Sequence, residues 1–104
     1  MTDTPATSTS WWLYILDCDG RLYTGISTDP ERRYREHLAG GPRAAKFSRA
    51  SKNIEMKYSV EVGERSLALR LEYGVKQLAR PAKLEIVEAE LGLAALVERL
   101  DARR

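Results

Sequence analysis

Residues 11–27 read WWLYILDCDGRLYTGIS, and the way this segment folds sets the architecture of the chain. Two runs of aromatic and branched side chains, Trp11–Leu16 and Leu22–Ile26, are typical of β-strands. Asp19-Gly20 between them is a strong signal for a tight turn, because glycine adopts positive φ without strain. The segment therefore predicts a β-hairpin.

This turn also predicts which side chains face each other. If Asp19 and Gly20 are the two central turn residues, Tyr14 lies opposite Gly25, and the missing side chain of Gly25 leaves open space beside the ring. Because side chains alternate along a strand, Tyr14 and Tyr23 then point to one face as diagonal neighbours. Two tyrosines on a sheet face are more commonly just half-buried core, so the pair alone does not establish a site.

The hydrophobic pattern of the whole chain predicts a small α/β (α+β) domain in which helices cover a short sheet. The further elements that we expect are a helix capped by Asp29 that runs to about Ala39, a strand over Ile54–Val62, a helix capped by Ser66 that runs through Ala79, and one or two helices after Pro81. Residues 1–10, MTDTPATSTS, are too polar to pack and are expected to form a disordered tail. Residues 11–104 then form a single domain.

The composition is that of an ordinary globular protein. The 104 residues are 43% hydrophobic and 31% charged, which argues against wholesale disorder. The longest apolar run, Trp11–Leu16, is far shorter than the roughly 20 residues that span a bilayer. One cysteine and one histidine offer neither a disulfide nor a zinc site. We therefore expect a one-domain cytoplasmic protein.

Basic residues are concentrated in the middle of the chain. Residues 29–52 contain seven Lys and Arg against three acidic residues, a net charge of +4. Such a stretch favours a phosphate-bearing partner, although a solvated surface of mixed charge explains it equally well. The candidate nucleic-acid-binding residues are Arg32, Arg43, Lys46, Arg49 and Lys52.

Two polar residues of the first predicted helix stand about one turn apart. Arg33 and His37 are at i and i+4, so they project from the same face of the helix. His37 near the end of the helix could simply interact with the helix dipole, and Arg33 could pair with Glu36 or Asp29. The spacing is therefore compatible with a functional site and with ordinary helix electrostatics.

Glu72 is the unusual residue of the second predicted helix. Its neighbours one turn away include Ala68, Leu69 and Val75, so its carboxylate lies at the edge of an apolar stripe. The carboxylate either reaches toward Lys76 or is held in place for a task such as binding a divalent cation. The surface ion pair is the commoner case in proteins.

Five residue types at matching spacing resemble the motif of the GIY-YIG nuclease superfamily. They are Tyr14 in WLYIL, Tyr23 in YTG, and then Arg33, His37 and Glu72. The segments LYTGISTDPERRYREH (22–37) and RSLALRLEYGVKQL (65–78) are similar to small stand-alone bacterial members of the YhbQ type. The resemblance extends from Trp11 to about Leu100, which is nearly the whole of the predicted domain.

The resemblance implies a three-stranded antiparallel sheet flanked by helices, and metal-dependent hydrolysis of phosphodiester bonds in DNA, in repair or recombination. Carried over by position, one of Tyr14 and Tyr23 accepts a proton from the attacking water while the other positions it. Arg33 grips the scissile phosphate, and a guanidinium can meet two of its oxygens at once. His37 lies near the nucleophile or the leaving group. Glu72 is the single acidic ligand of Mg²⁺ or Mn²⁺.

The sequence departs from the family pattern at two points. Trp12-Leu13 stands where the first half of the motif has Gly-Ile. Ile26-Ser27-Thr28 follows Gly25, where many relatives carry a lysine. Loss of that cation bears on the rate of the reaction or the route of the proton, and not on the fold.

Two further functions fit the same sequence. The first is a nucleic-acid-binding module with a weak or silent catalytic site, which would bind DNA in a salt-dependent way without cutting it. The second is an adaptor whose apolar C-terminal helices dock a partner protein. No zinc finger or helix-turn-helix accompanies the motif, so we expect little base specificity from this chain.

Overall fold

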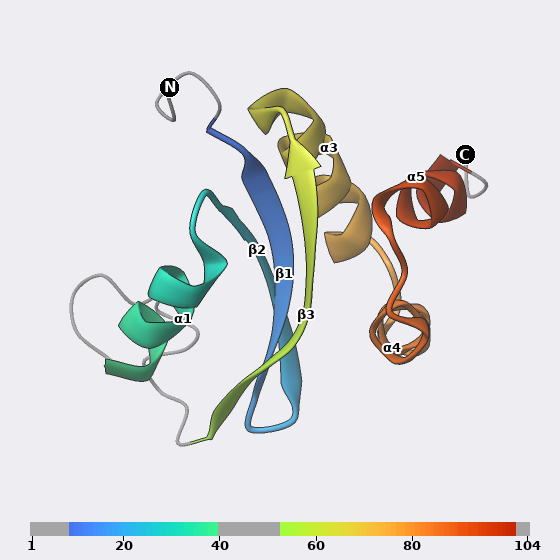
Figure 1. The fold of residues 1–104 in the computed structure, drawn as a ribbon. Coiled ribbons are helices and arrows are strands. Elements are labelled where there is room, and N and C mark those ends of the chain that lie inside the picture. Colours follow the sequence, from blue (N-terminus) through green and yellow to red (C-terminus); the bar gives the residue numbers. More distant parts are fainter. Residues whose placement is uncertain (1–8, 40–52, 102–104) are drawn as a thin grey trace.

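A three-stranded antiparallel sheet forms the centre of the computed structural model, which describes residues 9–39 and 53–101 (Figure 1). The strands lie in the order β2-β1-β3 and comprise β1 (Trp11–Cys18), β2 (Arg21–Ser27) and β3 (Ile54–Gly63). The helices within the described residues are α1 (Pro30–Ala39), α3 (Arg65–Lys76), α4 (Arg80–Ala89) and α5 (Leu93–Asp101). The predicted α+β class is confirmed.

The β1–β2 hairpin has the predicted register. Tyr14 lies opposite Gly25 and Leu16 lies opposite Tyr23. The turn residues Asp19 and Gly20 have φ of 54° and 90°, both in the left-handed region, as a tight hairpin turn of this kind requires. The two strands extend slightly beyond the predicted bounds, and their pairing is unchanged.

The same turn is also tied to the start of the third strand. The backbone N–H of Asp19 donates to the carbonyl oxygen of Asn53 at 2.9 Å, and the N–H of Asn53 donates to Oδ1 of Asp19 at 2.8 Å. These two bonds hold the end of the hairpin against the chain just before β3.

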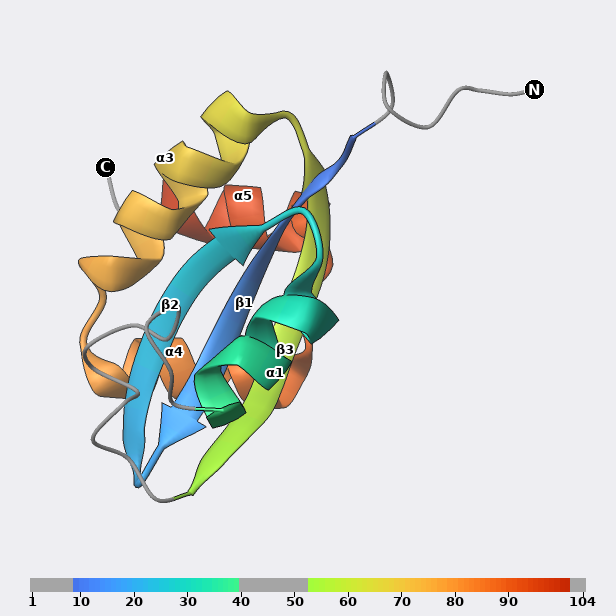
Figure 2. The same cartoon turned by 90° about the vertical axis from the view of Figure 1, so that its left-hand side faces the viewer.

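Helices cover both faces of the sheet, with α1 on one face and α3, α4 and α5 on the other (Figures 1 and 2). Because side chains alternate along β1, the strand contributes to two separate cores. Leu13 and Ile15 belong to the core that includes α3, α4 and α5. Tyr14 and Leu16 belong to a smaller core, which Tyr34 of α1 packs against.

Three hydrogen bonds fix the position of α1 over its face of the sheet. Oδ1 of Asp29 accepts from the N–H of Arg32 at 3.1 Å, so the predicted N-cap is confirmed, with Pro30 in the first turn. The Ser27 hydroxyl oxygen accepts from the N–H of Asp29 at 3.0 Å. The Tyr34 hydroxyl donates to the carbonyl of Ile54 at 2.9 Å, which links the helix to β3.

The predicted bounds of the second long helix are wrong at both ends. The helix α3 starts at Arg65, one residue before the expected cap Ser66, and its N-cap Glu64 makes no side-chain capping bond. Gly63 ends β3 with φ of 107°, so the backbone turns into the helix at this glycine without needing a capping side chain. At the other end α3 stops at Lys76.

The region after α3 forms two helices, one of the two outcomes that the sequence allows. Pro81 lies in the first turn of α4, where its lack of an N–H costs nothing. The predicted tail lies largely outside the described residues, and the single domain over residues 11–104 stays a prediction. No helix within the described ranges is long and apolar enough to cross a membrane.

Gly25 does not leave the open space that the hairpin register predicts. The Tyr14 ring itself fills it: a Cβ built on Gly25 would lie 2.6 Å from Oη of Tyr14 and 2.7 Å from Cζ. Contacts this short do not occur in folded proteins, so a side chain at position 25 excludes the observed position of the ring. The observed position of the Tyr14 ring therefore requires a glycine at position 25.

We predict that Gly25→Ala destabilises the protein by about 1–3 kcal/mol, because the added methyl group forces the buried ring out of place. Urea denaturation measures the effect. The matched control is Gly92→Ala, where a Cβ would meet no atom within 4 Å. Equal stability of the two variants would contradict the packing described here.

Candidate active site

The two tyrosines of the hairpin share one face of the sheet, the face covered by α1. Their ring centroids are 6.4 Å apart, and the ring planes are tilted by 44°. Tyr14 is buried and Tyr23 is half-buried. The predicted diagonal arrangement is confirmed, and one phenol is accessible while the other is enclosed.

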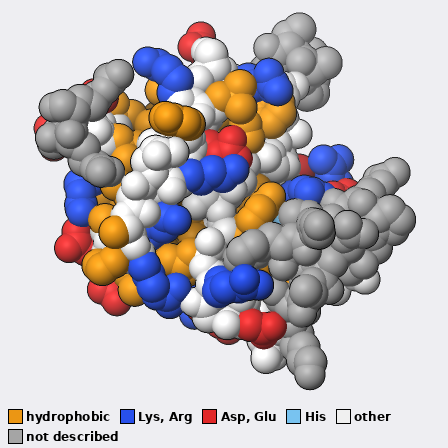
Figure 3. Space-filling model, turned by 180° about the vertical axis from the view of Figure 1, so that it is seen from behind, with side chains coloured by type: hydrophobic (Ala, Val, Ile, Leu, Met, Phe, Trp, Pro, Cys, Tyr) orange, Lys and Arg blue, Asp and Glu red, His pale blue; other side chains and the backbone are white. Residues whose placement is uncertain are grey.

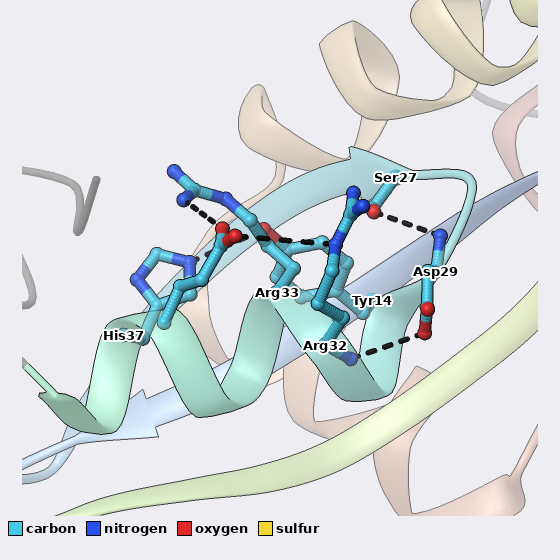
Figure 4. A network of polar contacts seen from close by, with 7 residues as sticks. Tyr14, Ser27, Asp29, Arg32, Arg33 and His37 are labelled. Atoms are coloured by element: carbon cyan, nitrogen blue, oxygen red, sulfur yellow. Dashed lines mark hydrogen bonds and ion pairs between the residues drawn. The ribbon is translucent and has the colours of Figure 1, made fainter.

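His37 of α1 is fully buried beside both rings. Its centroid lies 5.3 Å from that of Tyr23 and 6.2 Å from that of Tyr14, with edge-to-face geometry in each case. Nε2 of His37 is 3.3 Å from Oη of Tyr14 (Figure 4). Its burial against two phenols brings three of the five candidate site residues together.

Arg33 also projects toward this face, one turn before His37. Its Nη1 is 2.9 Å from Oε1 of Glu36, so the predicted alternative of an Arg33–Glu36 pair is realised (Figure 4). The guanidinium also hydrogen-bonds Tyr14. Arg33 therefore interacts with an acidic side chain of its own helix and with a phenol of the sheet.

Burial raises the pKa of Tyr14 to about 12. The neighbouring Tyr23 and, more weakly, the charge of Glu72 raise it further, while Arg33 acts in the opposite direction. The phenol is therefore protonated at neutral pH. It can accept a proton only if its own proton moves to another group at the same time.

Burial and the positive charge of Arg33 lower the pKa of His37 below its usual 6.5, and Glu36 partly offsets them. The imidazole is therefore neutral at pH 7. A neutral ring has one nitrogen that accepts a hydrogen bond, and with the proton on Nδ1 the Tyr14 hydroxyl donates to Nε2. The pair can thus pass a proton from phenol to imidazole.

Glu72 belongs to α3, in the layer on the other face of the sheet (Figures 1 and 2). Its side chain is 19% exposed, and its Oε2 lies 3.2 Å from Nζ of Lys76, so the predicted surface pair is present. Its negative charge is also the smallest of the contributions that raise the pKa of Tyr14. The ion pair with Lys76 is confirmed, and the metal-binding role of Glu72 stays a prediction.

The donor set suits Mg²⁺ or Mn²⁺ better than a metal that needs several protein ligands. No group of three or more His, Cys, Asp or Glu side chains within residues 9–39 and 53–101 could hold a metal ion. Mg²⁺ keeps several waters and is commonly held by one or two carboxylates together with substrate phosphates. Glu72 fits such a site, because its partner Lys76 is half exposed and an exposed pair is weak.

Four of the five basic residues proposed to bind nucleic acid belong to residues 40–52. Arg43, Lys46, Arg49 and Lys52 lie outside the described residues. Arg32 is on the exposed side of α1, 3.9 Å from Oε2 of Glu36. Glu36 contacts both Arg32 and Arg33. From the sequence, Glu36 is only one of two possible partners of Arg33, and it is not among the candidate site residues.

The sequence of the GIY-YIG catalytic domain matches residues 10–85 of this chain, a range that contains all five candidate site residues. The chain belongs to the GIY-YIG family. The proposed resemblance is confirmed at this level, and so is the likeness to small proteins of the YhbQ type.

The relatives that resemble this chain align with it over most of their own length. A UPF0213 protein of Klebsiella pneumoniae is 48% identical over 91 residues, covering 86% of this chain and 84% of the relative. The UPF0213 protein YhbQ of Escherichia coli is 45% identical over 93 residues, covering 88% and 91%. The solution NMR structure of the UPF0213 protein BH0048 from Bacillus halodurans has a TM-score of 0.51 at 32% identity, covering 85% of this chain and 93% of that one.

His37 is the single histidine of the chain, so its titration can be followed by NMR without assignment ambiguity. We predict a midpoint below 6.5, a higher midpoint in Arg33→Gln and a lower one in Glu36→Gln, because these variants remove charges of opposite sign. Glu31→Gln is the matched control, since Glu31 pairs with Arg35 on the exposed side of the same helix. A wild-type midpoint at or above 6.5 would contradict the burial described here.

The lowered pKa of His37 also predicts how stability depends on pH. Below about 6.5 the unfolded chain binds a proton at this histidine more readily than the folded chain does, so the free energy of unfolding falls as the pH drops from 6.5 through the folded pKa. In His37→Gln this part of the pH dependence should disappear. Urea denaturation of both proteins between pH 7.5 and about 5 tests it, and parallel curves would refute it.

Proposed function

We propose that this GIY-YIG protein is a metal-dependent endonuclease that hydrolyses phosphodiester bonds in DNA. The observation that supports this most is the convergence of Tyr14, Tyr23, Arg33 and His37 on one face of the sheet, with the charge of Glu72 acting on the same phenol. The residues combine a cation for phosphate, a proton acceptor and a carboxylate for a divalent ion, which is what hydrolysis of a phosphodiester needs.

Arg33 is the group that we assign to the scissile phosphate. Its side chain is 26% exposed, so the guanidinium is held by the protein and still accessible from solvent. Negative charge builds up on the non-bridging oxygens in the transition state, and an oriented guanidinium stabilises it without reorganising. The bond to Glu36 provides that orientation.

Tyr14 and His37 together take the proton of the attacking water. Tyr14 accepts the proton on Oη as its own proton moves to Nε2 of His37, 3.3 Å away. The water O–H bond breaks as the new P–O bond forms, and the P–O bond to the leaving oxygen breaks. The phenol ends neutral, the imidazole becomes an imidazolium, and the leaving oxygen takes up a proton from solvent. This route suits a phenol whose pKa is about 12 and a chain with Ile26 to Thr28 in place of the lysine found in relatives. Tyr23 is placed to orient the water.

Glu72 would hold the divalent metal, Mg²⁺ or Mn²⁺. When bound, such an ion neutralises charge on the phosphate and stabilises the leaving oxygen. The carboxylate is partly buried and its lysine partner is on the surface, so exchanging Lys76 for a cation leaves no buried charge unpaired.

We extend the proposal to DNA of little base specificity, to DNA repair or recombination, and to the cytoplasm. The names of the relatives give no substrate, so these points rest on the GIY-YIG family and on the charge of the chain. The silent nucleic-acid-binding module is the second candidate, and the missing lysine is the sequence feature that favours it.

We predict that the wild-type protein nicks supercoiled plasmid in the presence of Mg²⁺ or Mn²⁺ and not with EDTA. Glu72→Ala and Arg33→Ala should each lower the rate by about 10²–10³-fold, because each removes charge stabilisation that only the transition state needs. Matched controls are Glu85→Ala and Arg35→Ala, which remove exposed members of other ion pairs.

The outcomes separate the candidate functions. Folded wild-type protein that binds DNA and does not cut it would support the silent module and overturn the nuclease proposal. Cutting that survives in Glu72→Ala would move the metal site elsewhere. Loss of cutting in both control variants would mean that the assay reports stability instead of chemistry.

A further inference from the structure

An apolar groove lies between α3 and α5, apart from the candidate active site. It has a volume of about 660 Å³, and its walls include Leu71, Val97 and Leu100. Its lining contains none of the five candidate catalytic residues. Seen from behind in Figure 3, hydrophobic side chains reach the surface of the molecule among charged ones. The groove therefore needs an explanation other than catalysis.

Two exposed hydrophobic side chains of α3 flank this groove. Of the large hydrophobic residues in the described ranges, three are exposed, namely Leu38 at 52%, Leu69 at 39% and Tyr73 at 68%. Leu69 and Tyr73 both line the groove and stand at i and i+4, so they lie side by side on the helix. Single exposed hydrophobic residues are ordinary, but a projecting pair beside an apolar hollow is typical of an interaction surface.

Charges of both signs complete the lining. Arg70 of α3 and Asp101 of α5 are exposed and belong to the same groove. A uniformly acidic or basic partner would meet a like charge at one of them. A partner that carries both signs at matching positions meets an opposite charge at each.

We propose that the groove is the interface of a homodimer, in which Tyr73 of one chain inserts into the groove of a second copy. One patch supplies both the projecting aromatic side chain and the hollow that receives it, as a twofold symmetric interface requires. In the arrangement that we propose, Arg70 of each copy faces Asp101 of the other, so that opposite charges meet at two positions related by the symmetry. Tyrosine is a common anchor in interfaces, because it buries a large area with few rotatable bonds.

The test is the oligomeric state of the full chain. Sedimentation velocity of the wild-type protein should show a reversible monomer–dimer equilibrium as the concentration rises to about 1 mM, where even weak interfaces associate. Tyr73→Glu should leave a folded monomer over the same range, with circular dichroism as the check on folding. Leu38→Glu is the matched control, because it places the same charge on an exposed hydrophobic site of α1, and it should dimerise like the wild type.

A charge exchange tests the arrangement within the dimer. Arg70→Glu and Asp101→Arg should each weaken dimerisation about tenfold, because each removes two exposed pairs related by symmetry. The double variant should restore it, since the pairs re-form with reversed polarity.

Several results would overturn the proposal. These are a wild-type protein that stays monomeric at every concentration, a dimer that persists in Tyr73→Glu, an equal loss in Leu38→Glu, and a double charge variant no better than the single ones. A helix of another protein that occupies the groove of a monomer would assign the surface to a different partner. None of these results depends on whether the protein cuts DNA.

Discussion

The position of the Tyr14 ring over Gly25 is the constraint on which the candidate site depends. The register of the hairpin places a glycine opposite the tyrosine, and the ring uses the space of the missing side chain. A slip of one residue would turn every side chain of β1 to the other face of the sheet. The phenol would then lie under α3 and away from His37, and the two cores would exchange their residues.

Burial around this phenol decides the chemistry that the face can perform. An enclosed histidine loses its proton at a mildly acidic pH at which an imidazole in water would keep it, whereas the phenol is protonated at that pH in either setting. Among the described residues, the full charges that act on them are those of Arg33, Glu36 and, more weakly, Glu72. Such an arrangement suits a substrate that brings negative charge with it, because the guanidinium is already oriented.

Local rules account for the parts of the structure that the sequence predicts well. The hairpin register follows from Asp19-Gly20, the start of α1 follows from the Asp29 cap, and the five motif positions follow from the family resemblance. The errors concern long-range or backbone effects. Ser66 has the residue type of a cap, but the turn at Gly63 sets the start of α3. The space beside Tyr14 is occupied by the ring itself, and no local sequence pattern encodes that position of the ring. The pairing of Arg33 with both Glu36 and Tyr14 depends likewise on how α1 sits over the sheet.

The candidate site residues come from two segments that lie far apart in the sequence. Tyr14, Tyr23, Arg33 and His37 all fall within one hairpin and the helix that follows it, whereas Glu72 comes from a helix on the opposite face. Contacts within one short segment require only small loops to close, which costs little entropy, so they tend to form early in folding. Contacts between distant segments require larger loops to close and tend to form later. The cationic half of the candidate site therefore joins neighbouring segments of the chain, whereas the half that carries the carboxylate depends on the packing of α3 against the other face of the sheet. If hydrolysis needs both halves, the protein can act on nucleic acid only once its two layers have closed on the sheet.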